Sequence, residues 1–410
     1  MQTLTSNYSA IERKIVNIKP VQVKSNKTKK IFISGFLQHI IRKFIWVNIM
    51  WVALRIYKNP SVAFKKVKIL KQLRNKTRNN QPLPKYTRGG NRFFVNFNTP
   101  GWPSSAFNRY VAHQLNRFTD NSATSIHTLV FAITKKCGFQ CEHCFEWLNL
   151  NKPETLSRED ILLLIHRFQQ LGVCQVQLSG GEPLNRLPDI YYLLDNAPAG
   201  IDYWLYTTGY SLTPEKAQLL KQHGLTGITI SLDHCNEEEH NSFRGVKDAY
   251  KRALKAVGYA TAAGLIVCFS LCATKEFISE ENLLQYAELA KKYKVSFIQI
   301  LEPKAVGHFA GKDVTLQPHH QKKLEQFTDT FNYNVGYKSY PSVVYHEYNS
   351  RRFGCSGSGT DYVYADTDGD IHNCPFCQRK LFSAFDEELP DLLKQMKTKG
   401  CAAFSSCSKN

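Results

Sequence analysis

The stretch His127-Thr-Leu-Val-Phe-Ala-Ile-Thr-Lys-Lys-Cys-Gly-Phe-Gln-Cys-Glu-His-Cys144 joins a run of apolar residues to three closely spaced cysteines. The apolar part predicts a strand, and the cysteines follow it with the spacing C-x3-C-x2-C. Most iron–sulfur clusters take four cysteine ligands, so three thiolates without a fourth nearby leave one iron of a four-iron cluster open to another molecule. Cys137, Cys141 and Cys144 are therefore candidate ligands of a cluster that does chemistry at its open iron.

A second motif, Gln177-Leu-Ser-Gly-Gly-Glu-Pro-Leu184, follows another apolar run. Gly180 and Gly181 allow unusual backbone angles and the close approach of a ligand, while Glu182 offers a carboxylate and Pro183 fixes the turn. Together the two segments resemble the radical S-adenosylmethionine (radical SAM) enzymes. The resemblance implies a 4Fe–4S cluster whose open iron chelates the amino and carboxylate groups of SAM. It also implies that the glycine-rich stretch lines the methionine part of SAM and that Glu182 meets its ammonium group.

Looser matches extend the resemblance. His143 lies where the family usually places an aromatic residue that touches the adenine, although simple loop packing also explains it. Thr208 stands where the family has an asparagine, and its hydroxyl could still meet polar groups of SAM. The family's pattern implies that Ser231 contacts the ribose and that Arg244 pairs with the SAM carboxylate. The nearby Asp233 also suits a helix N-cap.

From residue 127 onward, short apolar runs alternate with helical stretches, which argues for a parallel sheet with helices outside it. Both motifs follow strands, so both are expected at the carboxyl ends of the strands, where such sheets place their active sites. The fold expected is α/β, a partial (βα)6 TIM-like barrel within 126–312, as in the family. The expected strands are 127–134, 173–179, 201–207, 227–232, 265–272 and 295–301. The expected helices are 157–171, 186–196, 213–223, 237–263 and 279–293.

A second group of cysteines lies near the C-terminal end. Asp368-Gly369 predicts a hairpin that would bring Cys355 near Cys374. The segment 351–410 resembles the SPASM/Twitch extension of radical SAM enzymes, which implies one auxiliary 4Fe–4S cluster. Its ligands would be Cys355, Cys374, Cys401 and Cys407, with Cys377 as a spare or a substitute. A structural zinc site is the alternative, because C-x2-C with two later cysteines also suits tetrahedral zinc.

The remaining cysteines read as buried free thiols that behave as small apolar residues. They are Cys174, Cys235, Cys268 and Cys272, and of these only Cys235 is expected near the active end of the sheet. The clustering of the other cysteines favours metal ligation in a reducing compartment over a disulfide framework. The first thirty residues show no secretory signal. We therefore expect a cytoplasmic protein, either free or peripheral on the inner face of the cytoplasmic membrane.

The net charge of +19 belongs to the N-terminal part of the chain. Residues 1–90 contain 20 Lys and Arg but one acid, Glu12, and no further acidic residue occurs before Asp120. Four segments are expected outside the barrel. They are a flexible basic tail at 1–30, a basic extension with an amphipathic helix at 31–125, a linking helical region at 313–350 and the cysteine-rich segment at 351–410.

Residues 31–57 predict a helix on which Gln38, Arg42 and Lys43 oppose Ile40 and Phe44. Its apolar run is too short to cross a bilayer, so a basic helix lying on an anionic membrane surface is one interpretation. A helix packed on the barrel or in a dimer interface is the other. RNA binding by the basic run 65–92 is less favoured, because few aromatic residues interleave it for base stacking.

These features predict a radical SAM enzyme that cleaves SAM to a 5′-deoxyadenosyl radical and modifies a substrate oxidatively by hydrogen abstraction. The substrate expected is a peptide or protein, or a membrane-associated small molecule, and the implied electron donor is a protein such as flavodoxin or ferredoxin. A radical SAM enzyme that modifies RNA and a zinc-dependent nucleic-acid or membrane binding protein are the alternatives.

Overall fold

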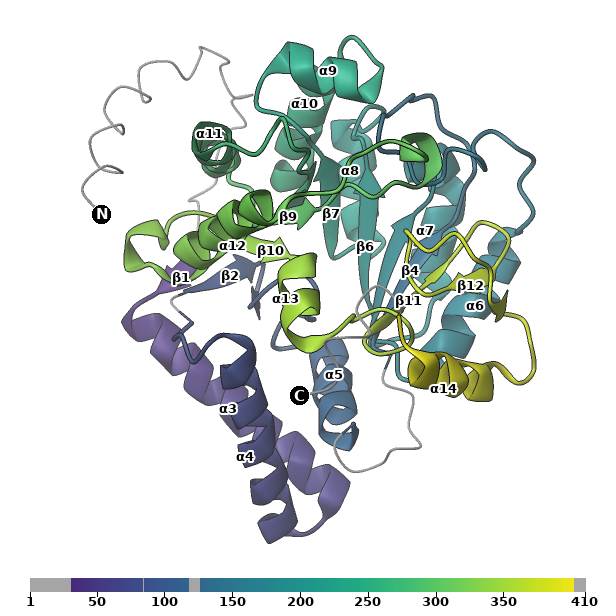
Figure 1. Cartoon of the computed structure of the whole chain (residues 1–410). Coiled ribbons are helices and arrows are strands. Elements are labelled where there is room, and N and C mark those ends of the chain that lie inside the picture. The colour runs from purple at the N-terminus through teal and green to yellow at the C-terminus, as the bar shows by residue number, and fades with distance from the viewer. Residues whose placement is uncertain (1–30, 84, 118–125, 402–410) are drawn as a thin grey trace.

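The computed structural model describes residues 31–83, 85–117 and 126–401. The expected basic tail, 1–30, and Cys407 lie outside these residues. The described chain builds two sheets, one of three short strands near its N-terminal end and one of ten strands that forms the body of the molecule (Figure 1).

The large sheet confirms the α/β prediction. Its strand order is β10-β9-β8-β7-β6-β5-β4-β11-β12-β13, and every pair from β10 to β11 is parallel. The six expected strands occupy its centre as β4 (Thr128–Ala132), β5 (Gln175–Ser179), β6 (Asp202–Thr207), β7 (Gly227–Ser231), β8 (Ile266–Cys272) and β9 (Phe297–Leu301). Because parallel strands are covered on both faces, β8 is buried along its whole length.

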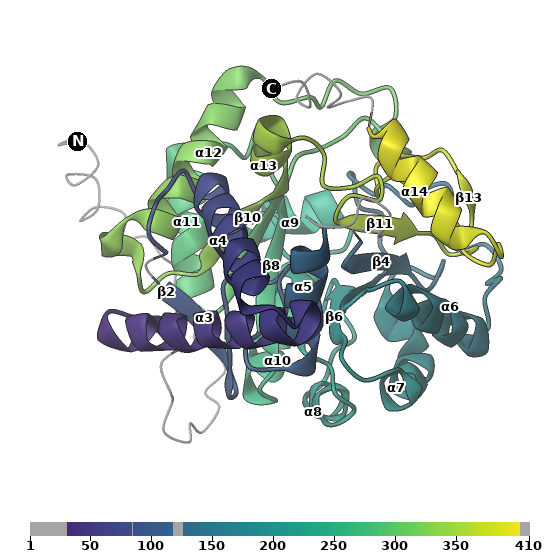
Figure 2. The same cartoon turned by 90° about the horizontal axis from the view of Figure 1, so that it is seen from below.

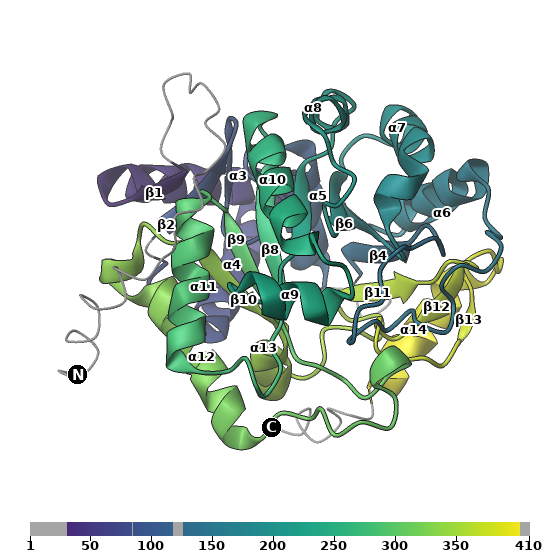
Figure 3. The same ribbon diagram turned by 90° about the horizontal axis from the view of Figure 1, so that it is seen from above.

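Helices follow one another along the outer face of this curved sheet (Figure 3). They are α6 (Arg158–Gln170), α7 (Leu187–Asn196), α8 (Pro214–Gln222), α10 (Ala249–Ala262), α11 (Glu280–Lys292) and α12 (Pro318–Tyr333). Side chains in the preceding loops fix where several of them begin, as when Ser157 and Asp160 form a reciprocal capping box on α6. The short 3-10 helices are η1 (Pro183–Arg186), η2 (Gly307–Phe309) and η3 (Val335–Tyr337).

The helix expected at 237–263 is two helices. The first, α9 (Glu237–Arg244), ends at Gly245, whose φ of +66° is a left-handed conformation that glycine adopts without strain. The second is α10, and the break between them turns Arg244 toward the strand ends.

Both edges of the six-strand barrel carry further strands. On one edge β10 (Ser342–Tyr345) pairs in parallel with β9, in a segment expected to be helical and linking. On the other edge β11 (Tyr362–Ala365) pairs in parallel with β4, and the expected hairpin leads to β12 (Asp370–His372) and then β13 (Phe382–Ser383). The C-terminal segment, with α13 (His346–Phe353) and α14 (Leu389–Lys399), therefore continues the barrel sheet.

The N-terminal extension packs against the amino ends of the strands. It contains β1 (Phe32–Ser34), α3 (Phe36–Tyr57), α4 (Pro60–Thr77), β2 (Lys85–Gly89), β3 (Arg92–Phe94) and α5 (Ser105–Asn116). Phe94 and Phe97 fill the bottom of the barrel against Trp204 and Phe297. Lys85 joins the two parts, because its buried Nζ donates to four backbone carbonyls between Phe331 and Pro341 at 2.6–3.3 Å.

Helix α3 packs on α4 and α5 rather than standing free. Ile41, Ile45 and Ile49 are buried with Val67 and Val111 in a core separate from that of the barrel. No described helix combines the length and apolar character needed to cross a membrane. Seen from below, α3 forms the outermost layer of this end of the molecule (Figure 2).

Candidate functional site

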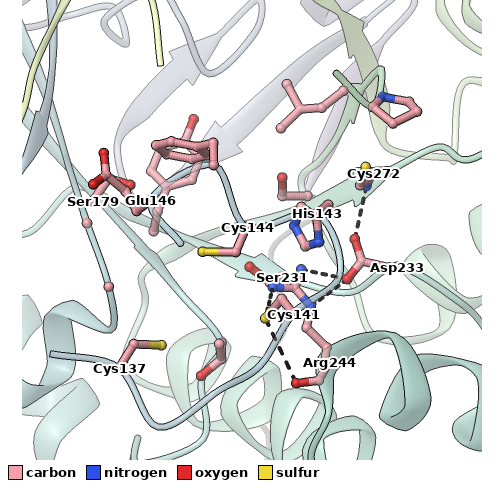
Figure 4. Close-up of a pocket in the computed structure, with 18 of the residues that line it drawn as sticks. Cys137, Cys141, His143, Cys144, Glu146, Ser179, Ser231, Asp233, Arg244 and Cys272 are labelled. Carbon is pink, nitrogen blue, oxygen red and sulfur yellow. Dashed lines mark hydrogen bonds and ion pairs between the residues drawn. The ribbon is translucent and has the colours of Figure 1, made fainter. Parts of the chain in front are cut away.

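The cysteine loop after β4 opens into a cavity at the carboxyl ends of the strands. Cys137, Cys141 and Cys144 all line this cavity, and Figure 4 shows their sulfur atoms turned toward the same space. All three are free thiols. Burial raises the pKa of Cys137 to about 11 and that of Cys144 to about 12. The unliganded thiols therefore keep their protons near neutrality, and a metal must displace those protons to bind.

The glycine turn after β5 holds one side of this loop. Gly181 N donates to Thr134 O, and Glu182 N donates to Lys136 O, both at 2.8 Å. A Cβ atom added at Gly180 would meet Thr134 O at 2.5 Å, and one at Gly181 would meet Lys136 O at the same distance. No larger residue fits at either position, because the obstructing atoms are backbone.

Two further segments clamp the loop. At the end of α9, Arg244 O accepts from Gln140 N at 3.3 Å and Phe243 O accepts from Glu142 N at 3.0 Å. After β9, His308 Nδ1 lies 2.9 Å from Cys141 O. Gly307 approaches so closely that an added Cβ would stand 2.1 Å from Cys144 O. The chain thus fixes the cysteine loop from three strand ends, which keeps the three thiols on one cavity.

Arg244 is committed to partners inside the protein. Its guanidinium donates to Asp233 Oδ2, with Nε at 2.6 Å and Nη2 at 2.5 Å, and its Nη1 lies 3.5 Å from Cys141 Sγ. Burial acts to raise the pKa of Asp233, but the charge of Arg244, the neighbouring His143 and His240 and the hydrogen bond from Cys272 N together outweigh it and lower that pKa. Asp233 is not a helix N-cap, since Asn236 caps α9. The pair places a positive charge against the cysteine loop.

The position of the Glu182 side chain does not suit direct contact with a ligand. Its carboxylate is buried beneath the cavity and accepts four hydrogen bonds, from Leu184 N, Thr207 Oγ1, Thr208 N and Thr208 Oγ1. Four donors leave the carboxylate little capacity for a ligand ammonium group. Pro183 is likewise buried at the start of η1. Both residues therefore support the turn that presents Gly180, Gly181 and Thr208 to the cavity.

The other expected binding residues do line the cavity, namely His143, Thr208 and Ser231. The His143 ring stacks on Phe243 with centroids 4.9 Å apart, and its buried Nδ1 has no hydrogen-bond partner among the described residues. Burial lowers the pKa of His143 to about 4, so the ring is neutral. An unpaired polar atom at the cavity wall suits a polar ligand.

The other cysteines behave as expected with one exception. Cys174 and Cys268 are buried free thiols, and Cys235 is partly buried at the site end of β7. The expectation that only Cys235 lies near the active end was wrong, because Cys272 at the end of β8 lines the cavity. Its backbone N–H donates to Asp233 Oδ1 at 3.0 Å.

The second cysteine group adjoins the cavity that the first group lines. Cys374 Sγ and Cys377 Sγ are 3.4 Å apart, and the thiol of Cys401 interacts with those of Cys355 and Cys377. Cys377 therefore belongs to this group within the described part of the chain. Between Cys374 and Cys377, Phe376 lines the cavity and meets the ring of Phe145 with centroids 5.9 Å apart.

Other contacts tie these two regions together. Lys135, at the start of the first loop, forms an ion pair of 2.5 Å with Asp368 in the hairpin turn. Gln378 Nε2 donates to Phe145 O at 3.4 Å. Among the described residues, no group of three His, Cys, Asp or Glu side chains is arranged to hold a single metal ion.

Charged residues missed by the sequence interpretation form another wall of the cavity. Glu302 and Lys304 line it, and Glu302 Oε1 accepts from Tyr345 Oη and Arg351 Nη1, both at 2.5 Å. Behind them the buried Glu347 stands 3.8 Å from Lys304, and its Oε2 has no hydrogen-bond partner. Burial raises the pKa of Glu347 to about 7. The sequence pattern predicted a strand at 295–301 but marked neither Glu302 nor Glu347.

Comparisons with known proteins agree with this geometry. The family model of the radical SAM superfamily matches residues 131–290. A GTP 3′,8-cyclase of Aliarcobacter butzleri is 30% identical over 203 residues, which cover 47% of this chain and 60% of that protein. An AdoMet-dependent heme synthase of Nitratidesulfovibrio vulgaris is 28% identical over 182 residues, covering 44% of this chain and 48% of the other. The matches to both of these curated relatives span less than two thirds of the relative's length.

Solved structures share the fold at low sequence identity. Streptococcus suis SuiB bound to precursor peptide SuiA matches with a TM-score of 0.56 and 14% identity, covering 88% of this chain and 84% of that one. The structure of anSMEcpe with bound AdoMet matches with a TM-score of 0.52 and 16% identity, covering 69% of this chain and 84% of that one.

Proposed function

We propose that this chain, which matches the radical SAM superfamily model over residues 131–290, is a radical SAM enzyme that cleaves SAM reductively at a 4Fe–4S cluster held by Cys137, Cys141 and Cys144. The observation that carries this proposal is the convergence of the three thiols on one cavity at the strand ends. A bound cluster would supply the electron for reductive cleavage of SAM to methionine and a 5′-deoxyadenosyl radical, which can remove a hydrogen atom from a substrate. A donor such as flavodoxin or ferredoxin would supply that electron.

The residues around the loop fit the binding of a cluster and SAM. Gly180 and Gly181 let the turn approach the backbone of the cysteine loop while lining the cavity. Thr208 and Ser231 offer hydroxyls to polar groups of a ligand. His143 offers a stacked ring with a free Nδ1. Since Arg244 is held by Asp233 beside Cys141, its role in this proposal is to place a positive charge next to the thiolates.

The second cysteine group supports the further proposal of an auxiliary 4Fe–4S cluster. Four thiols, those of Cys355, Cys374, Cys377 and Cys401, come together in the described residues. Four thiolates are the usual ligand set of such a cluster, so in this proposal Cys377 is a ligand rather than a spare. The adjoining Phe376 lines the SAM cavity. That arrangement suits a net oxidation in which the second site accepts the electron left on the substrate.

A peptide or protein side chain is the substrate that we propose. Two enzymes of similar fold have been captured with peptides, SuiB with precursor peptide SuiA and anSMEcpe with the Cp18Cys peptide. In this chain Lys304 lines the cavity. Its ammonium group could donate to a peptide carbonyl.

Anaerobic turnover tests the central proposal. The reconstituted protein should form 5′-deoxyadenosine from SAM under dithionite, whereas Cys141→Ala should form none. Cys174→Ala is the matched control, because Cys174 is a thiol buried in the barrel away from the cavity. The proposal fails if Cys141→Ala still cleaves SAM, or if the purified protein holds zinc and little iron.

A further inference from the structure

Helix α3 is apolar on both of its faces. The inner face contributes Ile41, Ile45, Ile49 and Val52 to the core shared with α4 and α5. The opposite face also carries large apolar side chains, and these are exposed. A helix with apolar residues on all sides is normally buried on all sides. The outer face of α3 is therefore left without a packing partner in the isolated chain.

The outer face consists of Leu37, Phe44, Val47, Trp51 and Leu54, which are 50%, 58%, 66%, 46% and 39% exposed. Their spacing of three, four and seven residues places them on one side of the helix. Together they expose on the order of 500 Å² of mostly apolar surface, near the upper end of what a monomer shows. Eight of the thirteen exposed large hydrophobic residues in the described chain lie within residues 36–64. We call the five residues the outer α3 surface.

The charged residues near this surface indicate which kind of partner binds it. Lys43, Arg55, Lys58, Lys65 and Lys68 are exposed on α3, on α4 and between the two helices. No acidic residue occurs anywhere between Glu12 and Asp120. A second copy docked face to face would bring these cations together without a compensating acid. An anionic surface would instead attract them, at about 1 kcal/mol for each cation near it.

The side chains have the arrangement of an interfacial helix. The Arg55 guanidinium lies 3.8 Å from the centroid of the Trp51 ring, which places a cation beside the aromatic ring that typically sits at the headgroup level. The packed inner face keeps α3 from entering the bilayer, so the helix would lie along it. α9, which borders the SAM cavity, lies at the opposite end of the molecule from α3 and α4 (Figure 1).

We propose that the outer α3 surface docks the protein on a bilayer that contains anionic lipid, with the five apolar side chains in the interface and the surrounding cations on the headgroups. This proposal does not depend on the cavity chemistry. It keeps only part of the apolar side that the sequence pattern indicated. Phe44 of that side is exposed, whereas Gln38, expected on the polar side, is buried and donates to Leu83 O at 2.8 Å.

Vesicle flotation of the full chain tests the docking. Wild type should float with phosphatidylcholine vesicles that contain phosphatidylglycerol, float less as salt is raised, and stay unbound with phosphatidylcholine alone. Val47→Glu and Trp51→Glu should each weaken binding at least about tenfold, because each places a carboxylate in the apolar interface. Both variants keep the basic residues 1–30, so that segment cannot explain a loss.

Leu163→Glu is the matched control. Leu163 is 50% exposed on α6, so this variant should float like wild type. All variants should show the wild-type circular dichroism and melting temperature, which separates lost docking from lost folding.

Three results would overturn the proposal. The first is a wild-type chain that does not float with anionic vesicles, or a Val47→Glu chain that floats as well as wild type. The second is a dimer in light scattering that Val47→Glu converts to a monomer, because the surface would then bind a second copy. The third is tRNA binding in gel shifts without flotation, which would assign the cations to RNA.

Discussion

Replacing Glu182 with glutamine should separate its buried structural role from a direct contact with SAM. The carboxylate accepts from four donors. Oε1 accepts hydrogen bonds from Leu184 N at 3.1 Å and Thr207 Oγ1 at 2.5 Å. Oε2 accepts hydrogen bonds from Thr208 N at 2.9 Å and Thr208 Oγ1 at 2.5 Å. Whichever way the glutamine amide turns, its NH2 group faces one hydroxyl and one backbone N–H.

The expected change in the free energy of unfolding follows from that hydroxyl and that backbone N–H. A threonine hydroxyl can rotate and accept from the amide, but the backbone N–H loses its acceptor in a buried site, at about 1–3 kcal/mol. The remaining bonds lose the charge that strengthened them, which adds about 1 kcal/mol. We therefore expect Glu182→Gln to lower the free energy of unfolding by about 2–4 kcal/mol. Formation of 5′-deoxyadenosine should fall as well, because Thr208 loses its anchor.

Urea unfolding of the iron-free protein measures this change without any contribution from the cluster. Glu276→Gln, at an exposed loop position, is the control and should change the free energy of unfolding by less than about 0.5 kcal/mol. If Glu182→Gln unfolds at the wild-type urea concentration and only SAM binding weakens, the carboxylate touches SAM and the reasoning from its four donors is refuted.

Further predictions concern the clamp, the second cluster and acid stability. Gly307→Ala should lower the iron content of the first site and SAM cleavage with it, since the new Cβ would stand 2.1 Å from Cys144 O; full iron loading would contradict the tight contact. Cys355→Ser should remove roughly four irons per chain while 5′-deoxyadenosine formation persists, and unchanged iron would exclude Cys355 as a ligand. Burial lowers the pKa of His127 to about 4, so from pH 6.5 down to 4 the unfolded chain takes up a proton that the folded chain does not. Stability should fall by up to about 3 kcal/mol over that window, and urea titrations of His127→Gln should show a shallower fall than wild type.

The central barrel could be predicted because each of its strands and helices has a strong local pattern. The run around Val267 predicts a buried strand by itself, and β8 occupies Ile266–Cys272. The same holds for the cysteine loop and the glycine turn, whose residue types are dictated by backbone approach and thiol chemistry.

The features that the sequence could not predict depend on contacts with residues far along the chain. β10 has only four residues, Ser342–Tyr345, so its β-branched pair after Pro341 was too short a signal to separate from the helices around it. The face of α3 could not be assigned because apolar residues occur all round the helix, and only packing on α4 and α5 decides which side is buried. The hydrogen-bond partners of Glu182 could not be predicted for a similar reason, since its four donors include groups of Thr207 and Thr208, at the end of the next strand.

The pairing of β11 with β4 explains why the second cysteine group, more than two hundred residues further along the chain, adjoins the cavity that the first group lines. Tyr362 to Ala365 align with Thr128 to Phe131, so the two strands run side by side, and the cysteine loop and the hairpin follow at the same edge of the sheet. The ion pair between Lys135 and Asp368 then fixes the hairpin turn against the first loop. A substitution such as Lys135→Met, which removes that ion pair without touching a thiol, should therefore loosen the second group relative to the first. Its signature would be a changed electron-spin interaction between the two reduced clusters at unchanged iron content, whereas an unchanged spectrum would mean that the strand pairing alone sets their separation.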